Sequence, residues 1–173
     1  MAIRCLALDV DGVLTKGEIV YTSSGEEIKA FHAKDGLGLA LAHRMGLQTA
    51  IITGRISPMV ERRAKELNIS HIQMGSHNKS AGLQELLHTL DLEAHEVAYM
   101  GDDLNDLGIM SKVGLAMTPQ DGVPEIKKVA HHICQAKGGE GAVREAVEYI
   151  LKQEGLWEDA VRSYREESYQ VGQ

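Results

Sequence analysis

The sequence predicts an α/β fold, a Rossmann-like parallel sheet with helices on both faces. Short apolar runs of strand length recur along the chain, and segments with the apolar spacing of helices separate them. This alternation is typical of parallel sheets, because a helix must carry the chain from the end of one strand to the start of the next. A chain of 173 residues that is 43% hydrophobic suffices for one domain, and we expect residues 1–173 to form it.

The expected strands come in chain order at 3–8, 47–52, 70–74, 96–100, 113–117 and 131–134. Ser57 followed by Pro58 is typical of a helix start, with an N-cap and a proline in the first helical position. Two later helices are indicated by apolar residues that share one face. They are Leu83, Leu86, Leu87 and Leu90 in the first, and Ala142, Val143, Ala146, Val147, Ile150 and Leu151 in the second.

Two segments depart from this alternation. In residues 16–32, Ile19, Tyr21 and Ile28 alternate with polar neighbours on either side of a Ser-Ser-Gly turn. This pattern predicts a β-hairpin flap, inserted after the first strand and overhanging the carboxyl end of the sheet. The second segment, residues 153–173, is polar from about 158 onward and is expected to form a C-terminal tail.

Aromatic side chains are few, and most lie outside the predicted sheet. Only Tyr99 falls in a predicted core strand. The other six fall in the flap segment or near the C-terminus: Tyr21, Phe31, Tyr149, Trp157, Tyr164 and Tyr169. Large rings outside the core favour contacts between subunits, and the alternative is a tail that folds back on its own domain.

Charge and composition exclude several classes of function. The net charge of −7 argues against a nucleic-acid partner, including a nucleic-acid 3′-phosphatase activity, because binding phosphate backbones requires clustered basic residues. Cys5 and Cys134 lack metal-ligand spacing and are expected to be buried, reduced thiols. No run approaches the roughly 18 apolar residues of a membrane helix, and no signal peptide is recognisable, so we expect a cytoplasmic protein without membrane contact.

Four polar features follow predicted strands. They are Asp9 with Asp11, the turn Thr53-Gly54-Arg55, Lys79, and the acidic cluster at residues 101–106. Ligands of open parallel sheets bind beyond the carboxyl ends of the strands, so these features are expected to meet. Carboxylates gathered there repel one another unless a cation compensates, which predicts a Mg²⁺ site that handles phosphate.

The residue types suit transfer of a phosphoryl group. Asp9 is the candidate nucleophile that attacks phosphorus, and Asp11 is the candidate acid and base that serves the leaving alcohol and then the attacking water. Mg²⁺ is expected on the Asp9 carboxylate, the Asp11 backbone carbonyl and Asp102. Asp103 and Asp106 are expected one layer further out, where they orient water or Lys79.

The remaining features complete a phosphate cradle. Thr53 offers a hydroxyl, Gly54 lets the backbone approach, and Lys79 supplies a positive charge for the phosphoryl oxygens. Each feature alone has an ordinary alternative: a solvated turn for the first acidic pair, a surface lysine for Lys79, and a helix N-cap for the 101–106 cluster. Their order, each after a predicted strand, favours the catalytic interpretation.

The motif at residues 9–13, together with Thr53, Lys79 and the Gly-Asp-Asp at 101–103, resembles the four motifs of the haloacid dehalogenase superfamily of phosphatases. About 40 residues separate the first two motifs, so the chain resembles members without a cap domain. Residues 31–38 and 137–145 are further similar to the 3-deoxy-D-manno-octulosonate 8-phosphate phosphatases. That resemblance implies Mg²⁺, a small sugar-acid phosphate as substrate, and a homotetramer in which neighbouring subunits close the site.

Substrate choice depends on weaker signals. Arg55 follows Thr-Gly where relatives that act on nine-carbon sialic-type 9-phosphates tend to have an acid, so it favours the eight-carbon substrate by binding its carboxylate. An ordinary salt bridge is the alternative for Arg55. Arg62 and Arg63 are candidates to reach the same carboxylate from an adjacent subunit, or they are solvated. Lys16 replaces an Asp that is common in relatives, which leaves the sugar open.

A function without turnover also stays open. The same acidic pocket would serve a phosphoacceptor or sugar-phosphate-binding module. Asp11 discriminates between the two, because an acid/base carboxyl beside the nucleophile promotes hydrolysis of an acyl phosphate. The Gly138-Gly139 pair is either a turn before the last helix or a loop that closes the site.

Overall fold

The computed structural model describes residues 2–170 and, for side chains, residues 2–166. A six-stranded sheet has the order β5-β4-β1-β6-β7-β8, and every neighbouring pair in it is parallel. The strands are β1 (Cys5–Leu8), β4 (Gln48–Ile52), β5 (His71–Gln73), β6 (Val97–Met100), β7 (Leu115–Thr118) and β8 (His132–Ile133). The predicted α/β class is therefore confirmed, with each strand inside or within one residue of its predicted range.

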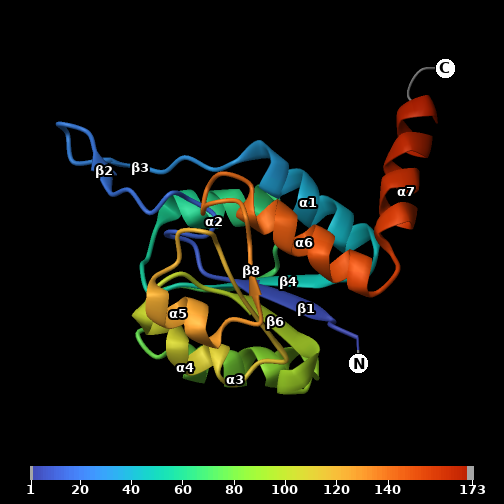
Figure 1. Ribbon diagram of the computed structural model, residues 1–173. Coiled ribbons are helices and arrows are strands. Elements are labelled where there is room, and N and C mark those ends of the chain that lie inside the picture. The colour runs from blue at the N-terminus through green and yellow to red at the C-terminus, as the bar shows by residue number, and fades with distance from the viewer. Residues whose placement is uncertain (1, 171–173) are drawn as a thin grey trace.

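Helices cover both faces of the sheet (Figure 1). One face carries α1 (Ala33–Arg44), α2 (Pro58–Glu66) and α6 (Ala142–Gln153), and the other carries α3 (Lys79–Leu90), α4 (Leu107–Met110) and α5 (Pro124–Val129). Two short 3₁₀ helices, η1 (Ala94–Glu96) and η2 (Leu104–Asp106), flank β6. Side chains of β1 alternate between the two cores, Leu6 and Leu8 on one side and Cys5 and Ala7 on the other, as the pleat of a fully buried strand requires.

The strand order determines where a ligand can bind. From β1 the chain runs outward through β4 to β5, and then returns to the other side of β1 to form β6, β7 and β8. The direction of winding therefore reverses between β1 and β6. In such sheets the loops after the strands diverge at this point and leave a crevice, so the residues that follow β1, β4 and β6 face a common space.

Residues 16–32 contain a short two-stranded antiparallel sheet of β2 (Val20–Tyr21) and β3 (Glu27–Ile28). It extends away from the main sheet (Figure 1). Its large apolar side chains are exposed, and Tyr21 reaches 59%. We call residues 16–32 the flap.

The C-terminal segment differs from the predicted tail. Helix α7 (Trp157–Gln170) occupies most of residues 153–173 and contacts α1 and α6. Ala160 is fully buried in the contact, so α7 is part of the packed structure at its N-terminal end. The segment is polar because the helix buries only a narrow stripe, and its far end points away from the sheet (Figure 1).

Most of the aromatic rings predicted to lie outside the sheet contact side chains of the same chain. Tyr149 stacks on His132 with ring centroids 4.0 Å apart, and the guanidinium of Arg144 lies 5.5 Å from the ring centroid of Trp157. Phe31 and Tyr164 have similar arginine contacts. These contacts agree with the alternative of local docking, while the side chain of Tyr169 lies outside the described residues. The expected contacts between subunits stay a prediction.

Cys5 and Cys134 are buried free thiols, as the sequence predicted. Burial raises the pKa of each thiol to about 12, so both are protonated at neutral pH. Within residues 2–170, no helix has the length and apolar character that crossing a membrane requires.

Candidate active site

The four predicted features meet at the carboxyl ends of β1, β4 and β6. Asp9 and Asp11 follow β1, Thr53 follows β4, and the acidic cluster follows β6. Together they surround a cavity of about 520 Å³. Its lining consists of Asp9, Asp11, Gly17, Ile19, Thr53, Gly54, Arg55, Asp102, Asp103, Leu104 and Asn105. This places predicted site residues from three separate parts of the sequence around one space.

Lys79, the first residue of α3, is buried beside the cavity. Its Nζ lies 2.6 Å from Asp9 Oδ2 and 2.6 Å from Asp106 Oδ1. Burial alone would lower the pKa of Lys79, but the two carboxylates raise it above its ordinary value, so the amine stays charged. The alternative of a solvated surface lysine is therefore wrong.

Asp106 is fully occupied by donors from the protein. Its Oδ1 accepts from Lys79 Nζ and from the Tyr99 hydroxyl at 2.7 Å. Its Oδ2 accepts from the backbone N–H groups of Asp102 at 2.9 Å and Asp103 at 3.3 Å. Four donors leave little room for a metal bond, so Asp106 orients Lys79 and the loop after β6.

Asp103 has a more local arrangement. Its Oδ1 accepts from the backbone N–H of Leu104 at 2.7 Å, which caps η2 at the rim of the cavity. The helix-cap alternative that the sequence left open thus applies to Asp103. Asp102, one residue earlier, stays directed toward the first acidic motif: a Cβ added to Gly12 would lie 1.9 Å from Asp102 Oδ2.

The acidic cluster suits a divalent cation. Ligand oxygens of Asp9, Asp102 and Asp106 all lie within 4.8 Å of one another. Burial and the neighbouring carboxylate of Asp106 raise the pKa of Asp9 to about 6, although Lys79 opposes the shift. Burial and the carboxylate of Asp9 raise the pKa of Asp102 to about 7. Carboxyl groups that resist ionisation because they are buried together are a fitting donor set for Mg²⁺, which binds oxygen ligands. Since Asp106 is occupied, Asp9 and Asp102 are the side chains that fit the ion.

The turn after β4 forms the opposite wall. The backbone N–H of Thr53 donates to the Gln73 carbonyl at 2.9 Å, and the Ser76 N–H donates to the Thr53 carbonyl at 3.1 Å. Both bonds attach the turn to the segment around β5. The Thr53 side chain is buried and lines the cavity together with Gly54.

Arg55 lines the cavity but is already paired. Its Nη2 lies 3.2 Å from Glu27 Oε1, and its Nε lies 3.8 Å from Asp11 Oδ2. The salt-bridge alternative is thus what the structure displays. The side chain is 41% exposed, which leaves the guanidinium accessible from the cavity.

Arg62 and Arg63 lie on α2, outside the cavity of their own chain. Both pair with Glu66, and Arg62 is 84% exposed. Arg63 also lies over the Phe31 ring. A role for either arginine would require a second chain, so that role stays a prediction.

Sequence reasoning missed two charged residues of the flap. Lys29 Nζ lies 2.5 Å from Asp11 Oδ1 and 3.0 Å from Glu27 Oε1. The Lys29 side chain is only 1% exposed. Glu27 and Lys29 are two residues apart in an extended segment and so share a face, which is the pattern that points to them.

The Gly138-Gly139 pair supports the loop after β1. The N–H of Gly139 donates to the Val13 carbonyl at 3.0 Å, and the N–H of Gly138 donates to Asp121 Oδ1 at 3.0 Å. A Cβ added to Gly138 would lie 1.8 Å from the Gly12 carbonyl oxygen. The pair therefore packs against the motif that carries Asp9 and Asp11 and is more than a connecting turn.

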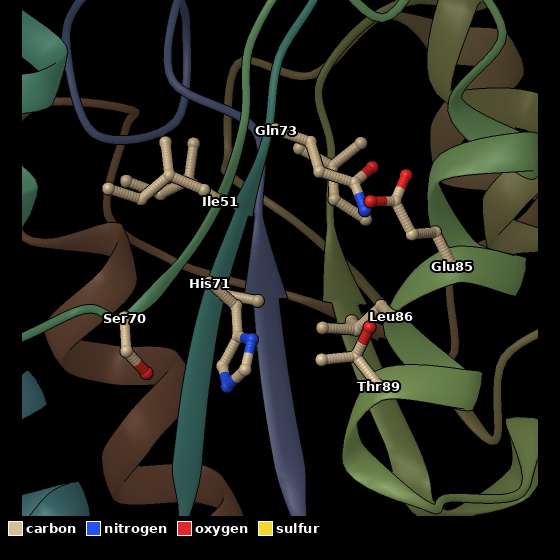
Figure 2. A pocket seen from close by; sticks show the side chains of 10 residues that line it. Ile51, Ser70, His71, Gln73, Glu85, Leu86 and Thr89 are labelled. Atoms are coloured by element: carbon tan, nitrogen blue, oxygen red, sulfur yellow. The ribbon is translucent and has the colours of Figure 1, made fainter.

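A second cavity, of about 170 Å³, lies between β4, β5 and α3. Figure 2 shows Glu85, Leu86 and Thr89 on α3 and His71 and Gln73 on β5. Among the described residues that line it, Glu85 is the only Asp, Glu, Lys or Arg. Without a cation or an acidic cluster, this cavity does not suit phosphate or a divalent ion.

Comparison with known proteins identifies the class of hydrolase to which the chain belongs. The sequence model of the haloacid dehalogenase-like hydrolase family matches residues 69–146. The 3-deoxy-D-manno-octulosonate 8-phosphate phosphatase KdsC of Yersinia pestis is 43% identical over 149 residues, which cover 86% of this chain and 80% of that protein. KdsC of Escherichia coli K12 is 42% identical over 158 residues, 91% of this chain and 84% of the relative. The chain therefore belongs to the haloacid dehalogenase-like hydrolases, in the group that contains these KdsC phosphatases.

Solved structures agree with this assignment. One is the 3-deoxy-D-manno-octulosonate 8-phosphate phosphatase of Moraxella catarrhalis, solved in complex with a magnesium ion, a phosphate ion and a KDO molecule. It superimposes with a TM-score of 0.91 and is 43% identical, and the match covers 94% of this chain and 93% of that one. The cobalt-bound phosphatase of Haemophilus influenzae has a TM-score of 0.87 and 35% identity, covering 90% and 91%.

Proposed function

We propose that this protein hydrolyses 3-deoxy-D-manno-octulosonate 8-phosphate to KDO and phosphate with Mg²⁺, through an aspartyl phosphate on Asp9. The observation that carries the proposal is the position of Asp9, which lines one cavity with a second acid and the Thr53 turn and is paired with a buried lysine. The 43% identity to a phosphatase solved with magnesium, phosphate and KDO supports the choice of substrate.

Asp9 is the proposed nucleophile. Its Oδ1 accepts from the Val10 N–H at 2.7 Å, and Lys79 holds its Oδ2, so the carboxylate has a fixed orientation. A carboxylate oxygen forms a bond to phosphorus while the bond from phosphorus to the sugar oxygen breaks. Lys79 and the Thr53 turn stabilise the charge on the phosphoryl oxygens.

Asp11 is the proposed acid and base. It gives a proton to the departing sugar oxygen, then accepts one from the water that attacks the aspartyl phosphate, and phosphate leaves with Asp9 restored. When bound, Mg²⁺ supplies positive charge at the phosphoryl group, held by Asp9, the Asp11 backbone carbonyl and Asp102. Asp106 and Asp103 keep Lys79 and the loop after β6 in place.

Arg55 is the proposed partner for the sugar-acid carboxylate. It is a planar, always charged group at the cavity wall, and a carboxylate from the substrate would replace or share Glu27. The nine-carbon 9-phosphates stay the second candidate, because Arg55 is the one described lining residue assigned to the sugar acid, and it leaves the sugar length open.

We also propose a homotetramer in which subunits close each other's sites. The exposed apolar residues Ile19, Val20, Tyr21 and Ile28 of the flap support it, because they are too numerous on one small projection to be left in water. Light scattering during gel filtration measures the mass directly. A cytoplasmic location stays a prediction from the sequence.

A substrate panel tests the function. Phosphate release is measured from the eight-carbon and nine-carbon 2-keto sugar acid phosphates, with Mg²⁺ and with chelator, for wild type and Asp9→Asn. We expect Mg²⁺-dependent turnover of the eight-carbon compound that Asp9→Asn abolishes, while Asp159→Asn, a matched change at an exposed ion pair, leaves it intact. Binding without turnover would favour the phosphoacceptor module, and full activity of Asp9→Asn would remove Asp9 as nucleophile.

A further inference from the structure

Four charged side chains form a closed ring at the base of the flap. Lys29 bonds Asp11 and Glu27, Glu27 bonds Arg55, and Arg55 approaches Asp11 at 3.8 Å. Two acids and two bases alternate, so the ring carries no net charge. It connects the flap to the loop after β1 and to the turn after β4, and within residues 2–170 no hydrogen bond between backbone groups joins these three segments to one another.

The Lys29 contact differs from an ordinary surface ion pair. Exposed pairs contribute little, because water and salt screen them. The Lys29 side chain is 1% exposed, while its partners Asp11 and Glu27 are 22% and 14% exposed. A buried ammonium is tolerated only where its partners are held in place, so the position of Lys29 constrains the position of Asp11.

We propose that Lys29 is a positioning residue for the reaction and holds the Asp11 carboxyl in the orientation that proton transfer requires. The inference rests on the proposed role of Asp11 as acid and base. Lys29 holds Oδ1, whereas Arg55 Nε lies 3.8 Å from Oδ2, beyond hydrogen-bond distance, so Oδ2 is the oxygen that exchanges a proton with the leaving sugar oxygen and with water. Small errors in such an orientation reduce rates strongly, because the proton must move along a short, aligned hydrogen bond.

The position of Lys29 on the flap adds a consequence. Asp11 comes from the main sheet, whereas Lys29 comes from the inserted segment, so the acid/base group is correctly placed only when the flap is in the position seen here. The flap thereby contributes to the chemistry as well as to the lining of the cavity, through Gly17 and Ile19.

Leaving-group dependence provides the first test. Release of p-nitrophenolate from p-nitrophenyl phosphate needs no proton from the enzyme, whereas release of a sugar alkoxide does. For Lys29→Met we expect kcat/KM to fall by about 10- to 100-fold on the sugar-acid phosphate and by less than about threefold on p-nitrophenyl phosphate. Lys29→Arg, which keeps the charge, is expected to recover most of the loss. An equal fall on both substrates would overturn the proposal, because it would indicate a general structural role.

A matched control uses the same flap. Lys16 pairs with Glu140 at 3.1 Å but is more than half exposed and does not contact Asp11. Lys16→Met is therefore expected to retain both activities. A loss of sugar-phosphate activity in Lys16→Met equal to that in Lys29→Met would assign the effect to flap charge in general and overturn the specific role of Lys29.

A double-mutant cycle with Asp11 provides the second test. If Lys29 acts through Asp11, adding Lys29→Met to Asp11→Asn should lower kcat/KM further by less than about threefold. If the two substitutions instead lower kcat/KM independently, so that their fold-losses multiply in the double variant, the proposal is overturned. The Asp11→Asn background also removes the carboxylate that Lys29→Met would leave unpaired, so the cycle remains decisive if the single variant folds poorly. Wild type without phosphatase activity would refute the proposed function, whereas an active wild type with unaffected Lys29 variants would refute only this inference.

Discussion

Replacing Lys79 by Met is expected to destabilise the protein as well as inactivate it. Lys79 is buried and lies 2.6 Å from each of two carboxylates, Asp9 and Asp106. Removing one partner of a buried ion pair costs roughly 3–5 kcal/mol, because the remaining charge is left unpaired. For a chain of this length each kcal/mol lowers the melting temperature by about 2–4 °C, so the expected decrease is roughly 6–20 °C.

The loss should depend on pH. In the wild type, burial and Asp106 raise the pKa of Asp9 to about 6 and Lys79 opposes them, so without Lys79 that pKa rises further. A carboxyl group whose pKa is higher in the folded than in the unfolded state lowers the stability of the protein as pH rises, because it ionises more readily in the unfolded chain. Lys79→Met should therefore lose more at pH 8 than at pH 5, where Asp9 is protonated and carries no unpaired charge.

The assay is thermal unfolding of metal-free protein at both pH values, followed by circular dichroism. The matched control is Lys112→Met, a change at an exposed lysine, for which less than about 0.5 kcal/mol is expected. A melting temperature of Lys79→Met within 3 °C of wild type, a margin of roughly 1 kcal/mol, would contradict the prediction, as would a deficit that is larger at pH 5 than at pH 8.

Two further predictions follow from the same geometry. Mg²⁺ should raise the melting temperature more at pH 7.5 than at pH 5, because protons compete with the ion for Asp102 and Asp9, whose pKa values are about 7 and about 6. A melting temperature that does not respond to millimolar metal at either pH would contradict the proposed metal site. Gly138→Ala should lower the free energy of unfolding by at least about 1–3 kcal/mol and should lower kcat, because its Cβ would overlap the Gly12 carbonyl and displace the loop that carries Asp11. Chemical denaturation and steady-state kinetics measure the two effects, and wild-type values of both would contradict the prediction.

Much of the fold could be predicted because local and global signals agree. The six apolar runs became the six strands of the sheet, and the Leu83 and Ala142 stripes became the buried faces of α3 and α6. Helix α7 was missed because its apolar stripe is narrow. Ala160 is buried and Trp157 packs against the core, but most of the surrounding residues are polar, so the segment resembles a tail in sequence.

The site was predictable where its residues follow strands. Asp9, Thr53 and Asp102 were placed by the rule for parallel sheets, and all three line the cavity. Lys29 and Tyr99 were missed as site residues for different reasons. A lysine on a hairpin is usually solvated, so nothing in the sequence marks Lys29 as buried. The Tyr99 ring is what a core strand is expected to carry, so the sequence does not reveal that its hydroxyl donates to Asp106.

The most direct test of the central claim is chemical trapping of the phosphorylated enzyme. Wild type is mixed with Mg²⁺ and the eight-carbon sugar-acid phosphate, quenched within milliseconds and reduced with borohydride, which converts an aspartyl phosphate into homoserine. Peptide mass spectrometry should then find homoserine at position 9, dependent on substrate and absent when substrate is omitted. Rapid phosphate release with an unmodified Asp9, or with homoserine at another aspartate, would contradict the account.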